Sequence, residues 1–355
     1  MKKLTFAIIL FFNLSNSIAQ IKPIIRLPKT DDNKILPIVT LDEGLVAATE
    51  SIIAKMKEVV NKANGFKNDK LTEVYNSTKV KGYYRNTNNV NGAIYYNPLR
   101  KKSVFIYGEI RKFFDTQGGS NSYIDYPVND ISNIKSGFDG QYGESATFEG
   151  ACVTVNSKRK LQAVFGEVYE KYRMLGGATS NLGFPVSDRA KYASTAYAQV
   201  FEGGIIIINN TTAYVITGAM AKKYNYADCG LPLGDAVTEK TGSQLKLLTI
   251  VTTQKFEKNT IVSSTKTKAC FVKNDIYKKW MTYGNAINNT CGLPTSDAVE
   301  NVGMTAQNFE KGLMLLVNGK VTFVPDDSEK NTQENNKIRQ TNRLDIIKFA
   351  PIKIQ

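Results

Sequence analysis

Four segments of the chain repeat one pattern, and this repetition restricts the possible folds more than any other feature of the sequence. Each copy begins with a helix-like stretch in which an apolar residue and an aromatic residue lie four positions apart, on one helical face. A break containing glycine follows, then a proline, an aspartate three residues later, and finally Phe-Glu. The copies begin at residues 108, 166, 218 and 274, so the period is 52 to 58 residues. Segments this short are expected to share a core with their neighbours.

Structural roles explain these repeated residues better than ligand binding does. The helical aromatic residues share their face with apolar residues and are predicted to lie in the core. The aspartates are predicted to accept backbone N–H groups in turns, and the glutamates to stabilise the next unit. The residues concerned are Phe114, Tyr172, Tyr224 and Trp280; Pro127, Pro185, Pro232 and Pro294; Asp130, Asp188, Asp235 and Asp297; and Phe148-Glu149, Phe201-Glu202, Phe256-Glu257 and Phe309-Glu310.

A β-hairpin is predicted after each Phe-Glu pair, because two strand-like runs are separated there by turn residues. The four hairpins are expected at residues 151–165, 204–217, 260–272 and 312–324. A fifth hairpin at 92–107 precedes the first complete copy, and an amphipathic stretch at 50–64 predicts a fifth helix. The predicted fold class is α+β, with about five helix-plus-hairpin units.

The second complete copy resembles the LGFP repeat. It contains Leu182-Gly183-Phe184-Pro185, followed by Asp188 and by Phe201-Glu202. The other copies depart from this pattern. The first contains Ile124-Asp125-Tyr126-Pro127, and the third and fourth have Cys229 and Cys291 where the leucine belongs.

The resemblance implies a non-catalytic, exported module of bacterial cell-envelope proteins that attaches its carrier to cell-wall material. It also implies that five units close into a disc with approximate fivefold symmetry. We therefore predict a propeller-like ring or disc over residues 44–324, with units near 44–107, 108–165, 166–217, 218–273 and 274–324.

The N-terminus is typical of a secretory signal peptide. Two lysines precede an apolar run at residues 4–14, and a small-residue cleavage site ends at Ala19. The run is shorter than a membrane span, and no later stretch is long enough to be one. We predict a signal peptide at 1–19, an extended lead-in at 20–43 and a polar tail at 325–355. The predicted location is secreted: periplasmic, cell-surface or extracellular.

The absence of histidine excludes Ser-His-Asp and Cys-His catalysis and histidine-ligated metals. No catalytic residue, metal or cofactor is predicted. The net charge of +14 favours a cell-envelope glycan or another anionic surface polymer as partner, and the export signal argues against nucleic acid. We expect a monomer.

Positive charge gathers at three of the predicted hairpin turns, where it could form a basic rim that binds phosphate or uronate groups. Exposed tyrosines could add contacts to sugar rings. The candidate binding residues are Arg100, Lys101, Lys102, Lys158, Arg159, Lys160, Lys266, Lys268, Tyr95 and Tyr96. The same lysines are also consistent with ordinary solvated turns. Two other functions stay open: a carboxylate-dependent glycan hydrolase using Asp188 and Glu202, and an adhesin or scaffold that binds protein.

Four cysteines in an exported chain could form two disulfides. They are Cys152, Cys229, Cys270 and Cys291, and their spacing does not choose among the three possible pairings.

Overall fold

The computed structural model describes residues 43–60, 73–75, 83–89, 92–241 and 248–326. The chain divides into two compact units, residues 1–42 and 43–355, and all described residues belong to the second. The predicted signal peptide at 1–19 lies outside the described residues. So do the predicted lead-in except for Glu43, and the predicted tail beyond residue 326.

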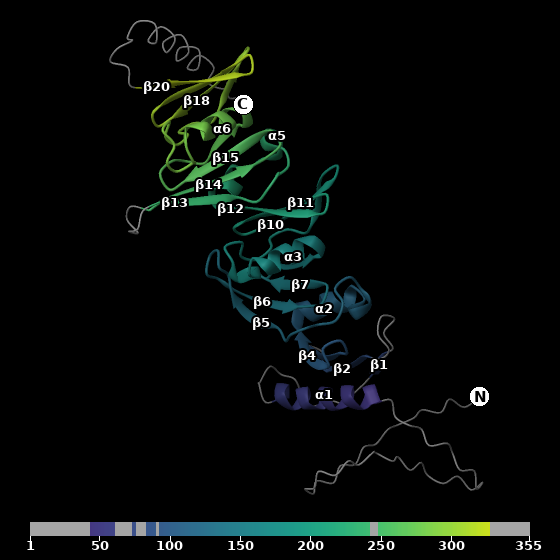
Figure 1. Ribbon diagram of the computed structural model, residues 1–355. Helices are drawn as coiled ribbons and strands as arrows, with labels where there is room; N and C mark the ends of the chain where they lie inside the picture. The colour runs from purple at the N-terminus through teal and green to yellow at the C-terminus, as the bar shows by residue number, and fades with distance from the viewer. Residues whose placement is uncertain (1–42, 61–72, 76–82, 90–91, 242–247, 327–355) are drawn as a thin grey trace, which may run out of the picture. The chain divides into compact units, whose positions relative to one another are not determined.

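Five four-stranded antiparallel sheets make up most of the described chain (Figure 1). In every sheet the strands are neighbours in chain order. The first sheet contains β1 (Glu73–Tyr75), β2 (Tyr83–Asn89), β3 (Gly92–Asn97) and β4 (Lys102–Tyr107). The second contains β5 (Ser132–Lys135), β6 (Tyr142–Thr147), β7 (Ala151–Val155) and β8 (Leu161–Phe165). The third contains β9 (Ala190–Ala193), β10 (Ala196–Phe201), β11 (Gly204–Asn209) and β12 (Thr212–Thr217). The fourth contains β13 (Val237–Thr241), β14 (Thr249–Lys255), β15 (Asn259–Ser264) and β16 (Cys270–Lys273), and the fifth contains β17 (Val299–Asn301), β18 (Met304–Phe309), β19 (Gly312–Val317) and β20 (Lys320–Pro325).

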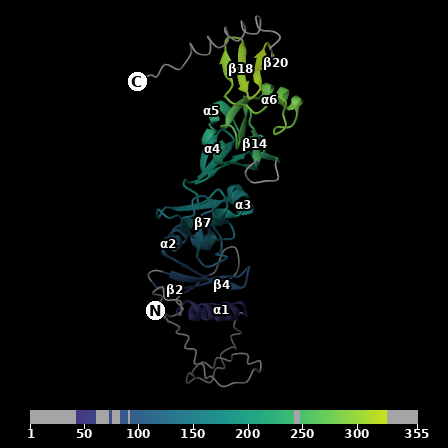
Figure 2. The same ribbon diagram turned by 90° about the vertical axis from the view of Figure 1, so that its left-hand side faces the viewer.

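Short helices connect consecutive sheets. They are α2 (Gly108–Thr116), α3 (Gly166–Met174), α4 (Gly218–Lys223) with α5 (Tyr226–Cys229), and α6 (Asn274–Trp280). Three short 3₁₀ turns follow α2, α3 and α6, at η1 (Gly119–Asn121), η2 (Gly177–Thr179) and η3 (Met281–Tyr283). The longer α1 (Glu43–Val60) packs along β2, β3 and β4 of the first sheet (Figures 1 and 2).

Each connecting helix packs against the sheet before it and the sheet after it. For example, α3 contacts β7 and β8 on one side and β11 and β12 on the other. The main contacts between described elements therefore join units that are consecutive in the chain. A closed ring of five units is not confirmed, and ring closure stays a prediction.

The hairpins predicted from the sequence supply only two of the four strands of each sheet. Two further strands precede each Phe-Glu pair, such as β5 and β6 in the second sheet. The first strands of two sheets are short and polar: β5, with the sequence SNIK, and β13, with the sequence VTEKT, are mostly exposed. Strands that bury so few residues give no clear alternating hydrophobic signal.

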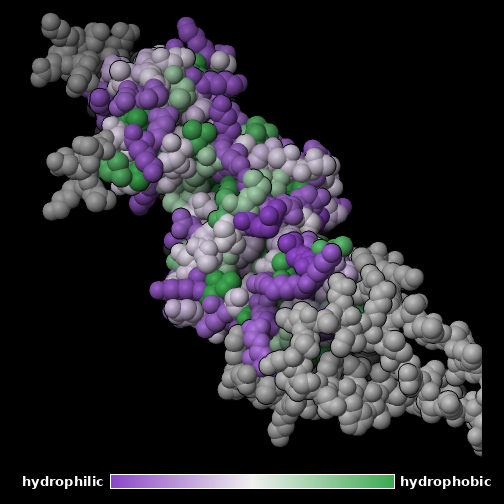
Figure 3. Space-filling view, turned by 60° about the horizontal axis from the view of Figure 1, so that its bottom comes forward, coloured by the Kyte–Doolittle hydropathy of each residue, from purple (hydrophilic) through white to green (hydrophobic). Residues whose placement is uncertain are grey.

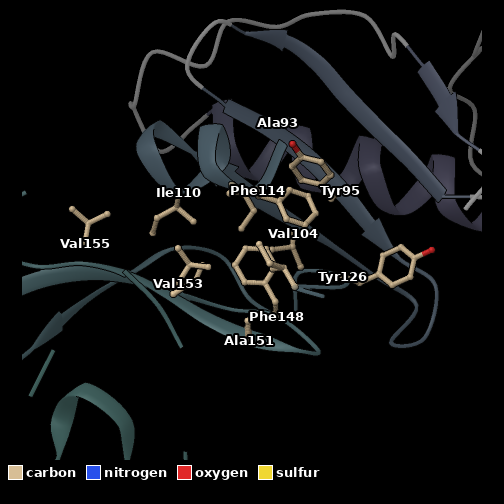
Figure 4. Packing of buried hydrophobic residues seen from close by; sticks show 14 residues of the cluster. Ala93, Tyr95, Val104, Ile110, Phe114, Tyr126, Phe148, Ala151, Val153 and Val155 are labelled. Atoms are coloured by element: carbon tan, nitrogen blue, oxygen red, sulfur yellow. The ribbon is translucent and has the colours of Figure 1, made fainter. Parts of the chain in front are cut away.

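The repeated helical residues lie in the core, as Figure 4 shows for the first connecting helix. Ile110 and Phe114 of α2 are fully buried, and the Phe114 ring stacks on Phe148 with 5.1 Å between centroids. Trp280 is likewise fully buried, and its indole N–H donates to the Gly292 carbonyl over 2.9 Å. These residues are therefore unavailable to a ligand.

The repeated glutamates stabilise the turns that contain the LGFP-like residues. Glu202 accepts a hydrogen bond from the Phe184 backbone N–H at 2.9 Å. Glu257 and Glu310 accept equivalent bonds from the N–H groups of Leu231 and Leu293. In every complete copy the proline also forms a β-bridge with the phenylalanine of Phe-Glu. The motif thus joins the two ends of its own unit.

Three of the four repeated aspartates, Asp130, Asp235 and Asp297, join their unit to the preceding one. The Val215 N–H, on the outer edge of β12, donates to Asp235 at 3.2 Å, and the Val215 carbonyl accepts from Gln254 at 3.0 Å. Phe271 on β16 has the same two partners from the following unit, Asp297 and Gln307. Backbone groups that would otherwise be unpaired at a sheet edge are thereby satisfied.

The disulfide prediction is corrected by the structure, in which Cys152, Cys229, Cys270 and Cys291 are all free and buried. Three of them belong to three different hydrophobic clusters, centred on different units, so their thiols are not neighbours. Burial raises the pKa of Cys152, Cys229 and Cys270 to about 11 each. These thiols are consequently unreactive in the folded protein near neutral pH.

Candidate functional site

The predicted basic residues lie at the turns between the third and fourth strands of three sheets. Two of these residues, Lys101 and Arg159, adopt left-handed backbone conformations, with φ of 51° and 58°. An asparagine or serine side chain at the start of each turn accepts backbone N–H bonds and holds its shape: Asn97, Asn156 and Ser264.

The two arginines of these turns are ion-paired. Arg100 forms a bidentate pair with Glu149, at 2.6 and 2.9 Å, and this pairing lowers the pKa of the Glu149 carboxyl. Lysine side chains at the turns are all exposed and form no hydrogen bond or ion pair with the residues that the structure describes: Lys101, Lys102, Lys158, Lys160, Lys266 and Lys268. Their role in binding stays a prediction.

Tyr95 and Tyr96 are corrected as candidate binding residues, because only 1% and 6% of their surfaces are exposed. Strand β3 is buried on both faces, by α1 on one side and by the cluster around α2 on the other. The Tyr95 hydroxyl donates to Asp115 at 2.7 Å within the protein. Neither ring can therefore contact a sugar.

A polar pocket of about 300 Å³ lies beside Arg159, where the end of β4 meets the second sheet. We call it the Tyr107 pocket. Its size is at the lower end of the range for small-molecule sites. It is lined by Tyr107, Asn133, Tyr142, Gly143, Glu144, Val155, Asn156, Ser157 and Arg159.

The ionisable groups of opposite charge in the pocket lining are Arg159 and Glu144, which lie 3.5 Å apart. Arg159 also lies 3.3 Å from Glu109, which is outside the lining. A guanidinium has five N–H donors, and several stay available after two ion pairs. The pocket therefore offers both hydrogen-bond donors and acceptors.

Two tyrosines provide the apolar surface of the pocket. Tyr142 is 58% exposed, and Tyr107 is half-buried with its ring 5.4 Å from that of Phe105. Burial, with a smaller contribution from Glu144, raises the pKa of Tyr107, so its hydroxyl stays protonated and able to donate. Aromatic faces beside amide, carboxylate and guanidinium groups can bind the apolar face and the hydroxyl groups of a sugar.

Of these residues, only Arg159 was predicted from the sequence to contact a ligand. Tyr107, Tyr142 and Glu144 lie on strands of two different sheets, so no motif joins them in the sequence. A possible signal was the aromatic residue that ends β4, immediately before the glycine that begins α2.

Over most of the described surface in Figure 3, hydrophilic residues surround small, separate groups of hydrophobic ones. None of the helices in the described ranges is both long enough and apolar enough to cross a membrane. Within those ranges, no group of three or more Cys, Asp or Glu side chains is arranged to hold a metal ion.

Comparison with protein families supports the resemblance seen in the sequence. Residues 182–228 match the LGFP repeat model. The chain contains an LGFP repeat. The matched segment begins at the Leu182 turn and includes the Glu202 carboxylate that stabilises it. LGFP repeats are generally non-enzymatic and suggest a protein associated with the cell wall.

Similar solved structures include virginiamycin B lyase from Staphylococcus aureus, at 9% identity over 72% of this chain and 70% of that one, with a TM-score of 0.14. The extracellular domain of BT4673 from B. thetaiotaomicron is 10% identical over 75% of this chain and 31% of that one, with a TM-score of 0.16. Similarities this low carry no argument about fold or function. No curated protein matches the sequence.

Proposed function

We propose that this protein is an exported, non-catalytic repeat protein that binds cell-envelope polysaccharide or peptidoglycan, and that the Tyr107 pocket is a sugar-binding site. The observation that carries the proposal is the composition of this pocket: two tyrosines, two asparagines, and Arg159 paired with the lining residue Glu144 and with Glu109 outside the lining. The LGFP repeat at residues 182–228 supports the location at the cell wall.

The charge in the pocket favours an uncharged sugar. Because the charges of the lining residues Arg159 and Glu144 cancel, the pocket gives a phosphate or uronate group no net attraction. The unpaired lysines at the hairpin turns would instead attract anionic polymers over a longer range, in a salt-sensitive way. We therefore assign recognition to the pocket and general attraction to the lysines.

The structure also bears on the hydrolase alternative. The Glu202 carboxylate accepts bonds from the Phe184 N–H and from Ser136, which explains its presence without catalysis. The adhesin or scaffold alternative has no comparable site among the described residues. We keep both as outcomes that the following experiment distinguishes.

The test is co-sedimentation of the protein with insoluble peptidoglycan, comparing wild type with Tyr142→Ala. Tyr226→Ala is the matched control, because Tyr226 is 42% exposed but lies outside the pocket lining. We expect Tyr142→Ala to lower retention about tenfold and Tyr226→Ala to leave it unchanged.

Failure of the wild type to bind at any salt concentration would overturn the proposal. Release of reducing ends would favour the hydrolase, and a stable complex with an envelope protein that resists glycosidases would favour the scaffold.

A further inference from the structure

The Tyr107 pocket has a counterpart one unit further along the chain. Tyr107 and Phe165 are the last residues of β4 and β8, the fourth strands of consecutive sheets. Glu109 and Glu167 are the second residues of the helices that follow. Arg189 lies 3.2 Å from Glu167, just as Arg159 lies 3.3 Å from Glu109. The two arginines come from different positions in their units, yet each is paired with the equivalent glutamate beside an aromatic ring.

Aromatic rings surround Arg189. Its guanidinium carbon lies 4.8 Å from the centroid of Tyr197 and 5.4 Å from that of Phe165. The ring of Tyr123 packs on Phe165 with 4.7 Å between centroids. Cation–π contacts of this kind hold an arginine and its neighbouring rings in a fixed arrangement.

Two of these rings are open to solvent. Tyr123 is 45% exposed and Tyr197 is 42% exposed, whereas the Arg189 side chain is only 18% exposed. Tyr197 is held by the largely buried cation and Tyr123 by the Phe165 ring, so both can receive the apolar face of a sugar without first being ordered.

An independent observation concerns Asp188, which precedes Arg189. Its equivalents are Asp130, Asp235 and Asp297. Each accepts a backbone N–H from the preceding unit and pairs with a lysine on the helix of that preceding unit. Asp188 is exposed and makes neither bond with any residue in the described ranges. The lysine is missing because α2 has Phe113 at the position that Lys171 and Lys223 occupy in α3 and α4.

The Asp188 carboxylate therefore has no structural task, and it is close enough to Tyr123 to contribute to the raised pKa of that tyrosine, which burial mainly causes. With Arg189 and Glu167 it gives the site one net negative charge, the same as that of Arg159 with its partners Glu109 and Glu144. A free carboxylate beside exposed rings can accept hydrogen bonds from sugar hydroxyls.

We propose that Tyr123, Asp188, Arg189 and Tyr197 form a second sugar-binding subsite, equivalent to the Tyr107 pocket and specific for the same class of uncharged sugar units. We call it the Arg189 site. Two consecutive units then bind one polysaccharide, which raises the overall affinity through multivalency. This inference rests on the proposed function.

The test compares two aspartates at equivalent positions, in the full chain, with insoluble peptidoglycan as the probe. Asp188→Asn removes a charge that has no partner, so the melting temperature is expected to stay at the wild-type value while the affinity falls about tenfold. Asp235→Asn removes a charge paired with Lys171, so the melting temperature is expected to fall while the affinity is unchanged. Tyr197→Ala is expected to lower the affinity in the same way as Asp188→Asn, and Tyr197→Phe to restore most of it.

The outcomes separate this inference from the proposed function. Loss of binding in both Tyr142→Ala and Asp188→Asn, with a larger loss in the double variant, supports two subsites. Loss in Tyr142→Ala alone overturns the Arg189 site and leaves the proposed function standing. Equal losses of affinity in Asp188→Asn and Asp235→Asn overturn the Arg189 site too, because a general structural effect then explains them. No binding by the wild type overturns both.

Discussion

The Glu202 carboxylate occupies the space that a β-carbon on Gly183 would need. A β-carbon at this position would lie 2.3 Å from Glu202 Oε2, and Gly183 has a φ of 66°, a conformation that favours glycine. The glycine of the LGFP turn therefore serves two purposes. It adopts the left-handed turn, and it lets the carboxylate reach the Phe184 N–H.

The first complete copy shows what happens when the glycine is missing. Asp125 takes the position of Gly183 with a φ of 65°, and its own carboxylate accepts the N–H of Tyr126 at 2.9 Å. Glu149, the equivalent of Glu202, instead binds Arg100 and Asn97 of the preceding unit. One substitution thus redirects a bond within the turn to a bond between units.

We predict that Gly183→Ala destabilises the protein by about 3 kcal/mol, from the cost of a left-handed alanine and the loss of a hydrogen bond to a charged group. Gly218→Ala is the matched control, since Gly218 has a φ of 59° and a β-carbon added to it would have no neighbouring atom within 4 Å. It is expected to cost only about 1 kcal/mol. Urea unfolding of both variants measures the difference, and equal losses would contradict the steric role of Glu202.

Gln254 contributes to the contact between the third and fourth units. Its side-chain amide donates to the carbonyls of Val215 and Gly234. We predict that Gln254→Ala costs about 1–3 kcal/mol, because two partly buried carbonyls lose their donor. Gln254→Glu is expected to cost more at pH 7, since a carboxylate would face two carbonyl oxygens without a proton to donate. Chemical unfolding checks both values, and a glutamate variant as stable as wild type would contradict the assigned bonds.

Because burial raises the pKa of the thiols, we expect the free energy of unfolding to fall at alkaline pH. Burial raises the pKa of Cys152 from 9.0 to about 11, so the folded state holds its proton more tightly than the unfolded state does. Stability should therefore be at its full value below pH 9 and fall as the pH rises toward 11. We expect the decrease in the free energy of unfolding between pH 8.5 and 10.5 to be smaller in Cys152→Ala than in the wild type.

The free cysteines can be counted by thiol titration. We expect four thiols in denaturant without reductant and almost none in the folded protein. Fewer than four in denaturant would contradict the free-cysteine assignment.

Salt separates the contribution of the lysines from that of the pocket. We predict that the double variant Lys158→Ala/Lys160→Ala weakens binding to an anionic wall polymer at low salt, and that the difference from wild type disappears at about 0.5 M salt, where the screening length is only a few ångströms. The loss caused by Tyr142→Ala should persist at both salt concentrations. Co-sedimentation at two salt concentrations measures both effects, and a salt-sensitive Tyr142→Ala loss would contradict the uncharged-ligand assignment.

Residue patterns alone predicted the repeats, the connecting helices and a structural role for the proline and Phe-Glu residues. These features depend on contacts within about one unit, and such contacts leave a periodic trace in the sequence. The mostly exposed edge strands, such as β5 and β13, left no such trace. The inner strands β10 and β14 contain buried residues but were not predicted either, so half of each sheet was missed. The predicted role of the glutamates in stabilising the next unit was wrong, because Glu202, Glu257 and Glu310 each stabilise a turn of their own unit.

Tertiary structure alone decided which side chains reach solvent together. Tyr95 and Tyr96 alternate along β3 as expected, but α1 covers the face that would otherwise be open, so both are buried. Tyr107 and Tyr142 line one pocket although they come from different sheets, and Asp188 is left without a lysine because of Phe113, a residue 75 positions earlier in the chain. The recurring motif of each unit is encoded locally, whereas the candidate sites arise where one unit meets the next, and that geometry exists only in the folded protein.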